Sequence, residues 1–233
     1  MKNVLVTAGA AGIGKKIAER FADKGCNIWV CDINESTLDE VPQNWKTSLL
    51  DVSDEIKVKS LFEKITSEWG TLDTVCCNAG NAGPTNLTEK IELSDWKNCL
   101  AVNLEGAFLT SKYAIPLMKK RLAGSILFTS STAGIYGYPN RAPYSAAKWA
   151  IIGMTKYLGV YFAQKNIRVN ALSPTGVYNN HPEEFVKKLS NIIPMGRMAD
   201  INEYKGAIVF MCSDASSYMT GENVVIDGGK SVW

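Results

Sequence analysis

The fold class is decided by one stretch near the start of the chain, Thr7-Ala8-Gly9-Ala10-Ala11-Gly12-Ile13-Gly14. A run of β-prone residues, 3–7, precedes it, and residues 13–24 place their apolar side chains on one helical stripe. Glycines at a strand-to-helix turn let the backbone approach a pyrophosphate, which the helix N-terminus stabilises. The stretch predicts a dinucleotide-binding turn with contacts from Gly9, Gly12, Ile13 and Gly14.

An acidic residue, Asp32, ends the second apolar run, twenty residues after Gly12. A carboxylate at this place accepts hydrogen bonds from the adenosine ribose hydroxyls and repels a 2′-phosphate. Ile33 follows it instead of an arginine, and no basic residue interrupts Ala10-Ala11. We therefore expect NAD as cofactor, in preference to NADP. The alternative interpretation is that Asp32 only caps the turn that follows it.

Short apolar runs alternate with amphipathic stretches from one end of the chain to the other. The predicted strands are 3–7, 27–32, 47–50, 71–77, 125–130, 168–173 and 223–227. The predicted helices are 13–24, 53–69, 94–121, 143–164, 182–190 and 201–212. Because Pro116 lies inside the third of these, we expect that helix to kink or to end early. This alternation predicts an α/β fold, a doubly wound parallel sheet of about seven strands with helices on both faces (a Rossmann fold).

Composition limits the classes of function. The 233 residues are 46% hydrophobic and 21% charged with a net charge of +2, and the basic residues are dispersed, so we expect no nucleic-acid partner. No signal peptide or membrane-length apolar run is found, which predicts a cytoplasmic protein without a membrane partner. The six cysteines form no CxxC pair and no His/Cys metal spacing, so no metal is expected. The absence of a linker or repeat favours a single domain, 1–233.

Two residues four positions apart, Tyr144 and Lys148, lie near the start of a predicted helix and face the same way. A free phenol ionises near pH 10, and a neighbouring ammonium lowers that pKa toward the range of a general acid/base. Ser131 follows a strand whose carboxyl end faces the ligand crevice, where a hydroxyl can bind the substrate oxygen. The alternatives are a solvated helix pair and an ordinary turn serine.

The combination of these motifs resembles the short-chain dehydrogenase/reductase family over nearly the whole chain. Tyr144, Lys148 and Ser131 match its catalytic set, and Asn103 matches its structural and proton-relay asparagine. The resemblance implies further cofactor contacts from Asp51-Val52 at the adenine ring, from Asn78, Ala79 and Gly80 in the cleft, and from Pro174, Val177 and Asn179 after the sixth strand, besides Tyr144 and Lys148.

The resemblance also implies a mechanism. Tyr144 exchanges a proton with the substrate oxygen, Lys148 holds the nicotinamide ribose and lowers the tyrosine pKa, and Ser131 positions the substrate. Asn103 supports a water that links Lys148 to solvent. The chain departs from the family pattern at three points: Ala8 stands for a glycine of the first turn, Thr175 for a glycine, and Asn179 for a threonine.

The residues around the expected substrate site are largely polar. Tyr138, Arg141 and His181, with Ser131 and Tyr144, are the candidate substrate contacts. They predict a small-molecule substrate such as a sugar, polyol or sugar acid, since a steroid or long acyl chain needs an apolar wall. Arg141 is interpreted equally well as a contact to a carboxylate or phosphate and as a solvated loop cation. His181 is either a substrate contact or a surface residue.

The alternative enzyme is a 3-oxoacyl-carrier-protein reductase, whose family members commonly carry a basic residue in the glycine turn that this chain lacks. A protein of another class, a non-catalytic NAD-binding regulator or scaffold, typically loses the tyrosine or lysine that this chain retains.

The resemblance implies a homotetramer or homodimer formed through helices 103–121 and 144–164. The second of these helices carries more apolar surface than one core-facing stripe needs.

Overall fold

The computed structural model describes residues 1–233 and contains one seven-stranded parallel sheet. The strand order is β3-β2-β1-β4-β5-β6-β7, so the order reverses between β1 and β4, where ligand crevices form in doubly wound sheets. The strands are β1 (Asn3–Thr7), β2 (Asn27–Asp32), β3 (Lys46–Leu49), β4 (Thr74–Cys77), β5 (Gly124–Thr129), β6 (Ile167–Pro174) and β7 (Asn223–Ile226). The predicted fold class is confirmed.

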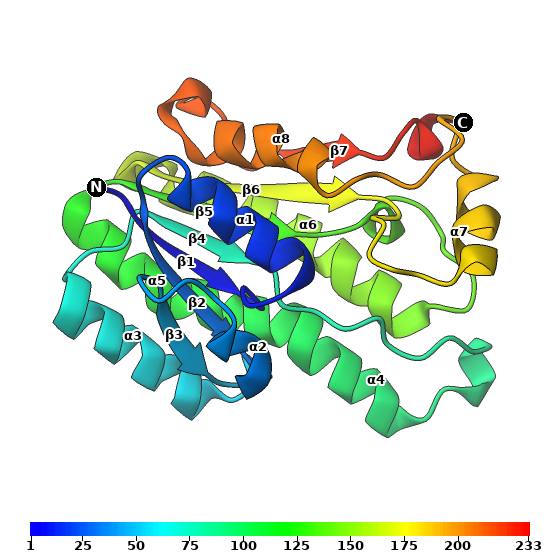
Figure 1. Cartoon of the computed structure of the whole chain (residues 1–233), viewed down its shortest axis with the longest axis horizontal. Coiled ribbons are helices and arrows are strands. Elements are labelled where there is room, and N and C mark those ends of the chain that lie inside the picture. Colours follow the sequence, from blue (N-terminus) through cyan, green and yellow to red (C-terminus); the bar gives the residue numbers. More distant parts are fainter.

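Helices cover both faces of the sheet (Figure 1). They are α1 (Gly12–Ala22), α2 (Glu35–Asp39), α3 (Glu55–Trp69), α4 (Leu93–Leu100), α5 (Gly106–Arg121), α6 (Ala142–Phe162), α7 (Glu183–Ser190) and α8 (Asn202–Cys212). One buried cluster lies between the sheet and α3, α5 and α6, and a second lies between the opposite face and α1, α2 and α8.

The alternation of side chains along β1 explains the two clusters. Leu5 belongs to the cluster under α3, α5 and α6, while its neighbours Val4 and Val6 belong to the opposite one. Successive side chains of a strand point to opposite faces, so a strand covered on both faces is apolar throughout. All three side chains are almost completely buried.

The structure contains two helices where the sequence predicted the single helix 94–121. α4 and α5 are joined by a π-helical turn over Ala101–Glu105, and α5 continues through Pro116 to Arg121. The break thus lies near Asn103, and α5 neither ends nor breaks at Pro116. The sequence interpretation also missed α2, because its five residues are too few to show helical periodicity and Asn34-Glu35-Ser36 read as a turn.

Loops and short helices gather beyond the carboxyl ends of the strands. Figure 1 shows α7 and the C-terminus on this side of the sheet, beyond the end of β6. None of the helices combines the length and the apolar character needed to cross a membrane. The fold therefore places the turn after β1, the end of β5, the start of α6 and the loop after β6 around one region.

Candidate active site

A cleft of about 720 Å³ opens at the carboxyl ends of the central strands and brings most of the predicted site residues together. The predicted residues that line it are Gly12, Ile13, Gly14, Asp32, Asn78, Gly80, Asn103, Ser131, Tyr138, Arg141, Tyr144, Lys148, Pro174, Val177, Asn179 and His181. Residues far apart in the chain meet here because parallel strands deliver all their carboxyl ends to one edge of the sheet.

The turn after β1 forms one end of the cleft. Gly12 has a φ of +51°, and a side chain added there would meet only the Asn179 amide at 3.8 Å, so its backbone faces open space. A side chain at Gly14 would lie 1.9 Å from the carbonyl oxygen of Ala8, so this position requires glycine. No side chain caps the start of α1, and the N–H groups of residues 12–14 have no partner within the chain. Such a cradle fits a pyrophosphate.

The Asp32 carboxylate lies beside this turn at the end of β2. It accepts hydrogen bonds from the backbone N–H of Ala10 at 3.3 Å and of Asn34 at 3.3 Å. Asp32 thus lines the cleft and also holds the turn, so the two interpretations of its role are compatible. A carboxylate oxygen has more than one lone pair, which leaves acceptor capacity for ribose hydroxyls.

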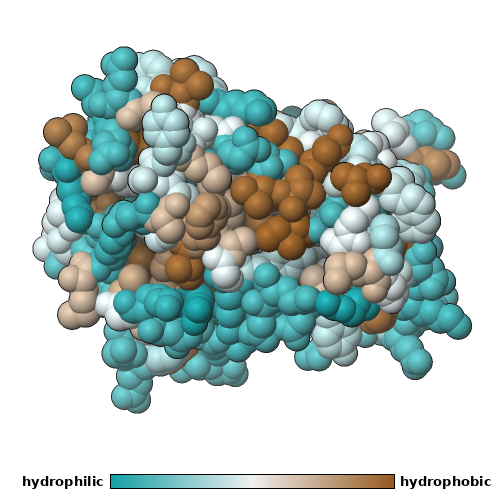
Figure 2. Space-filling view, turned by 90° about the horizontal axis from the view of Figure 1, so that it is seen from above, coloured by the Kyte–Doolittle hydropathy of each residue, from teal (hydrophilic) through white to brown (hydrophobic).

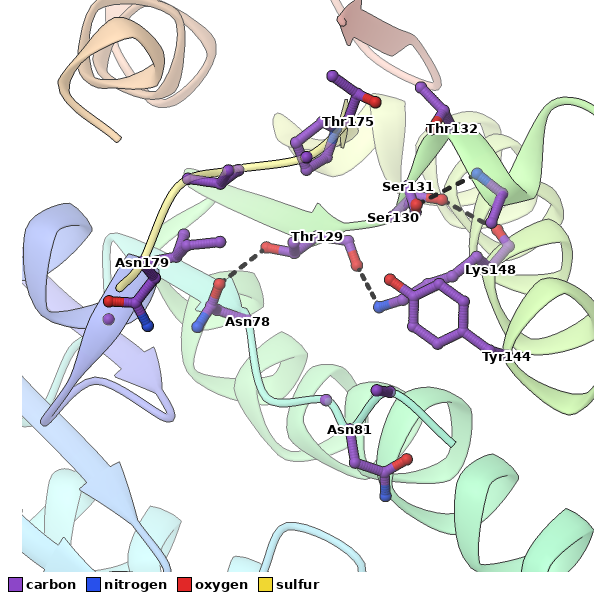
Figure 3. A pocket seen from close by; sticks show the side chains of 18 of the residues that line it. Asn78, Asn81, Thr129, Ser130, Ser131, Thr132, Tyr144, Lys148, Thr175 and Asn179 are labelled. Carbon is purple, nitrogen blue, oxygen red and sulfur yellow. Dashed lines mark hydrogen bonds between the residues drawn. The ribbon is translucent and has the colours of Figure 1, made fainter. Parts of the chain in front are cut away.

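Asn78 ties together the ends of three strands. Its backbone N–H donates to the Thr7 hydroxyl at 2.9 Å, and its side-chain amide donates to the Thr7 carbonyl at 3.3 Å. Its Oδ1 accepts from the Thr129 hydroxyl at 3.3 Å (Figure 3). These bonds link β1, β4 and β5 where the cleft begins, so Asn78 shapes the cleft wall.

Tyr144, Lys148 and Ser131 meet in the middle of the cleft (Figure 3). The Lys148 Nζ lies 5.5 Å from the centre of the Tyr144 ring and donates a 2.8 Å hydrogen bond to the Thr129 carbonyl. The Ser130 hydroxyl donates to the Lys148 carbonyl at 3.0 Å, which fixes α6 against the end of β5. Ser131 caps the short 3₁₀ helix Thr132–Gly134 by accepting from the N–H of Ala133, and its hydroxyl still faces the cleft.

The pKa values of this pair are shifted in the protein alone. Burial raises the pKa of Tyr144, and the Ser131 hydroxyl and the Arg141 charge offset part of that rise. Burial also lowers the pKa of Lys148 to about 8. Burial thus determines the direction of both pKa shifts in the protein alone, and an effect of Lys148 on the tyrosine in the presence of cofactor stays a prediction.

Asn103 lies in the π-helical turn between α4 and α5. Its Nδ2 donates to the carbonyl oxygens of Cys99 and Asn81, each at 3.0 Å, while its buried Oδ1 has no hydrogen-bond partner. π-Turns inside helices are rare and frequently mark functional sites. Asn103 and Lys148 line the same cleft, so a polar molecule such as water can bridge the free Oδ1 acceptor and the lysine ammonium.

The segment after β6 closes over the glycine turn. Val177 forms a β-bridge with Ala199, and the Asn179 amide lies opposite Gly12. Pro174 and Val177 line the cleft with Asn179, so the two departures at Thr175 and Asn179 leave the segment in place. The Thr175 hydroxyl is buried and has no hydrogen-bond partner.

Four predicted cofactor contacts do not line the cleft. Gly9 packs against Val30 under the turn, and Val52 is buried against Gly106. Asp51 is exposed and accepts from Ser53, while the Ala79 N–H donates to the Thr7 hydroxyl. Gly9, Val52 and Ala79 thus support the structure around the cleft, and a contact of any of these four residues with a bound cofactor stays a prediction.

The substrate end of the cleft holds all three loop residues named from the sequence. Tyr138 and Arg141 come from the loop before α6, and His181 stacks on Phe185 with 4.9 Å between ring centres. His181 therefore lines the cleft instead of lying on the open surface. Sequence reasoning did not name several of the residues that line the cleft as site residues: Asn81, Phe185, Leu189, Met198 and Lys230. Phe185, Leu189 and Met198 make this end less polar than the sequence suggested.

A family model described as enoyl-(acyl carrier protein) reductase matches residues 8–231. The chain belongs to the short-chain dehydrogenase/reductase family. Short-chain dehydrogenases/reductases of this kind are oxidoreductases that act on CH–OH groups with a nicotinamide cofactor, and this chain is one of them. The enzyme assignment from the sequence is confirmed.

Relatives within the short-chain dehydrogenase/reductase family span different substrates. A 3-oxoacyl-[acyl-carrier-protein] reductase of Thermotoga maritima is 36% identical over 239 residues, covering 98% of this chain and 97% of the relative. An NAD⁺-bound xylitol dehydrogenase superposes with a TM-score of 0.94 at 30% identity, covering 98% of each chain. A 3-ketoacyl-(acyl-carrier-protein) reductase of Brucella melitensis complexed with NADH gives 0.92 at 30%, covering 99% of this chain and 98% of that one.

Proposed function

We propose that this protein is an NAD-dependent oxidoreductase that interconverts a secondary alcohol and a ketone by hydride transfer. The observation that carries the proposal is the meeting of Tyr144, Lys148 and Ser131 in a cleft that continues to the glycine turn of α1. A bound nicotinamide cofactor supplies the hydride to the substrate carbon, or accepts it. The residues that would hold it are the turn at 12–14, Asp32, Lys148 and the segment 174–179.

The protein residues handle the proton and the orientation of the substrate. In reduction the Tyr144 hydroxyl donates its proton to the carbonyl oxygen, and in oxidation the phenolate accepts the hydroxyl proton. The Ser131 hydroxyl donates a hydrogen bond to the same oxygen and stabilises the charge that develops there. The Lys148 ammonium is the cation nearest to the Tyr144 ring. The free Oδ1 of Asn103 offers an acceptor for a water through which the proton returns to solvent.

The preference for NAD over NADP rests on Asp32. Its carboxylate lines the cleft beside the glycine turn, and its two backbone bonds hold it there. A 2′-phosphate would bring like charges together in a partly buried place. Two similar structures contain NAD⁺ or NADH and a third, ElxO, contains NADP, so similar proteins bind either cofactor and the proposed preference rests on Asp32 alone.

The substrate we propose is small and polar, such as a sugar, polyol or sugar derivative. Asn81, Tyr138, Arg141 and His181 provide hydrogen-bonding groups at the substrate end of the cleft. The similar xylitol dehydrogenase acts on a polyol, which is consistent with this class.

A second candidate is a 3-oxoacyl thioester of the type that acyl-carrier-protein reductases use. Phe185, Leu189 and Met198 line the cleft and offer an apolar wall for a short acyl chain. The Thermotoga relative carries this name at 36% identity. The absence of a basic residue in the glycine turn remains the difference from the usual NADPH-dependent members.

The deciding experiment follows absorbance at 340 nm with NAD and NADP over a panel of polyols, sugars, sugar acids and secondary alcohols. The reverse reaction is followed with a 3-oxoacyl N-acetylcysteamine thioester. Turnover of a polyhydroxylated class with NAD supports the first candidate, and turnover of the thioester alone supports the second. A higher kcat/KM with NADP than with NAD would overturn the cofactor assignment.

We also propose a homotetramer or homodimer in solution. The exposed side of α6 carries Trp149, Tyr157, Val160 and Tyr161, each more than half exposed, with Phe108 of α5. Figure 2 views a different side of the molecule, where α8 and β7 lie, and there too apolar side chains gather within a hydrophilic border. Two copies of one chain can bury such faces against each other. Light scattering coupled to gel filtration tests this, and a monomer at micromolar concentration would contradict it.

A further inference from the structure

Charge is distributed unevenly along the cleft. Its one lining carboxylate, Asp32, lies at the end beside the glycine turn. The substrate end is lined by the cationic side chains of Arg141 and Lys230, with no acidic residue. Neither of these cations has a carboxylate within ion-pair distance. Partly buried charges are normally paired. Arg141 and Lys230 therefore remain available to pair with a negatively charged group of a ligand.

Lys230 reaches the cleft from the far end of the chain. It begins the short 3₁₀ helix Lys230–Val232 after β7, and its Nζ lies 4.9 Å from the centre of the Tyr138 ring and 5.8 Å from that of Tyr136. The ring faces hold the ammonium in position without neutralising it. The nearby Asp227 carboxylate accepts from the N–H groups of Gly229 and Ser231, so it shapes the loop instead of pairing with Lys230.

Arg141 reaches the same end from the loop before α6. One of its nitrogens donates to the Ala82 carbonyl at 3.0 Å, and its guanidinium carbon lies 5.9 Å from the centre of the Tyr144 ring. A guanidinium has five N–H donors, so most of its donors remain available. The group is thus held by one backbone bond next to the residue that exchanges the proton.

We propose that the substrate carries an anionic group, a carboxylate or a phosphate monoester, near its reacting carbonyl, and that Arg141 and Lys230 bind that group. This inference rests on the proposed oxidoreductase function and narrows its substrate class from polar to anionic. Arginine matches such groups with paired hydrogen bonds, and lysine adds a point charge. The two residues determine specificity and leave hydride and proton transfer to the rest of the site.

The test measures ligand binding to the enzyme saturated with NAD, where a ketone cannot be reduced and binding is separate from turnover. Isothermal titration calorimetry compares two matched pairs: acetoacetate with acetoacetamide, and hydroxyacetone phosphate with hydroxyacetone. We expect the anionic member of at least one pair to bind about tenfold or more tightly than its neutral partner, in line with the strength of charge-assisted hydrogen bonds. The pair with the larger ratio identifies carboxylate or phosphate as the preferred group.

Three variants show whether Lys230 is responsible. Lys230→Met should bring the ratio close to one, Lys230→Arg should retain most of it, and Lys188→Met, at an exposed lysine of α7 outside the cleft, should leave it unchanged. Equal affinity for anionic and neutral members, no binding of either anion at millimolar concentration, or an unchanged ratio in Lys230→Met would overturn the proposal. Failure of NAD to saturate the enzyme would instead contradict the proposed function.

Discussion

The ammonium group of Lys148 donates a 2.8 Å hydrogen bond to the main-chain carbonyl oxygen of Thr129 and lies in no ion pair. The side chain is 3% exposed, and burial lowers its pKa from 10.5 to about 8. A shift of this size corresponds to ~3 kcal/mol of destabilisation when the ammonium is charged. Natural proteins keep such costs where function requires them.

Replacing Lys148 should therefore raise stability and abolish activity. At pH 7 the lysine is charged in both states, so Lys148→Met should increase the free energy of unfolding by up to ~3 kcal/mol. Because the folded pKa is the lower one, the wild type gains stability as pH rises from about 8 to 10.5, and the difference between the proteins should shrink over that window. Urea unfolding of both proteins at several pH values measures it. A less stable variant at pH 7 would refute the argument.

Removal of the Tyr144 hydroxyl should separate the effect on proton transfer from the effect on cofactor binding. Tyr144→Phe keeps the ring and its place in the cleft but loses the proton donor, so we expect turnover to fall by about 10²–10⁴-fold. NADH fluorescence should show unchanged cofactor affinity. Tyr157→Phe, on the exposed side of the same helix, serves as the control and should retain full activity. Wild-type turnover in Tyr144→Phe would show that another group moves the proton.

The Asp32 carboxylate should set the choice between the two nicotinamide cofactors. Asp32→Ala removes both the acceptor for the ribose hydroxyls and the repulsion of a 2′-phosphate. Since a hydrogen bond to a charged group contributes about 1.5–3 kcal/mol, the NAD-to-NADP ratio of kcat/KM should fall by roughly 10–100-fold. Asp39→Ala, an exposed residue outside the cleft, should leave the ratio unchanged. A ratio that stays constant in Asp32→Ala would remove this basis for the NAD preference.

The backbone of the glycine turn should tolerate no side chain at position 14. In Gly14→Ala the new methyl would lie 1.9 Å from the Ala8 carbonyl oxygen, so the start of α1 must shift and cofactor affinity should be lost. Gly206→Ala in α8, where the methyl meets no atom within 4 Å, should be neutral or stabilise the protein by about 0.5–1 kcal/mol. Calorimetric titration with NAD measures the cofactor affinity of both variants, and urea unfolding measures the stability of Gly206→Ala. Normal affinity in Gly14→Ala would show that the turn does not hold the cofactor.

Ala8 stands where the family has glycine, and the structure shows its cost. Its φ is +48°, in the left-handed region that costs a residue with a Cβ roughly 1–2 kcal/mol. Ala8→Gly should relieve this strain, partly offset by the greater freedom of glycine in the unfolded chain, for a net gain of up to ~1 kcal/mol. Chemical denaturation measures the change. A destabilised Ala8→Gly would mean that the Ala8 methyl makes packing contacts worth more than the strain.

The sequence by itself determined the strands, most of the helices and their order. Apolar runs such as Asn3–Thr7 and the amphipathic stripe after Gly12 carry local periodicity, and parallel topology follows from strand–helix alternation. It also identified Tyr144, Lys148, Ser131 and Asn103, because their spacing is short or matches a family motif. The sequence contained no measure of desolvation, because desolvation depends on the packing around a side chain, and that packing raises the pKa of Tyr144 in the protein alone.

Only the tertiary structure decided which residues share the cleft. Lys230 lies 86 positions from Tyr144 in the chain, and no local pattern connects them, yet the last strand of the sheet returns it to the substrate end. The same folding places the Val52 side chain in the core, which the motif around it did not indicate. Spacing along a chain predicts contacts within one helix or strand, whereas contacts between elements depend on how the layers pack.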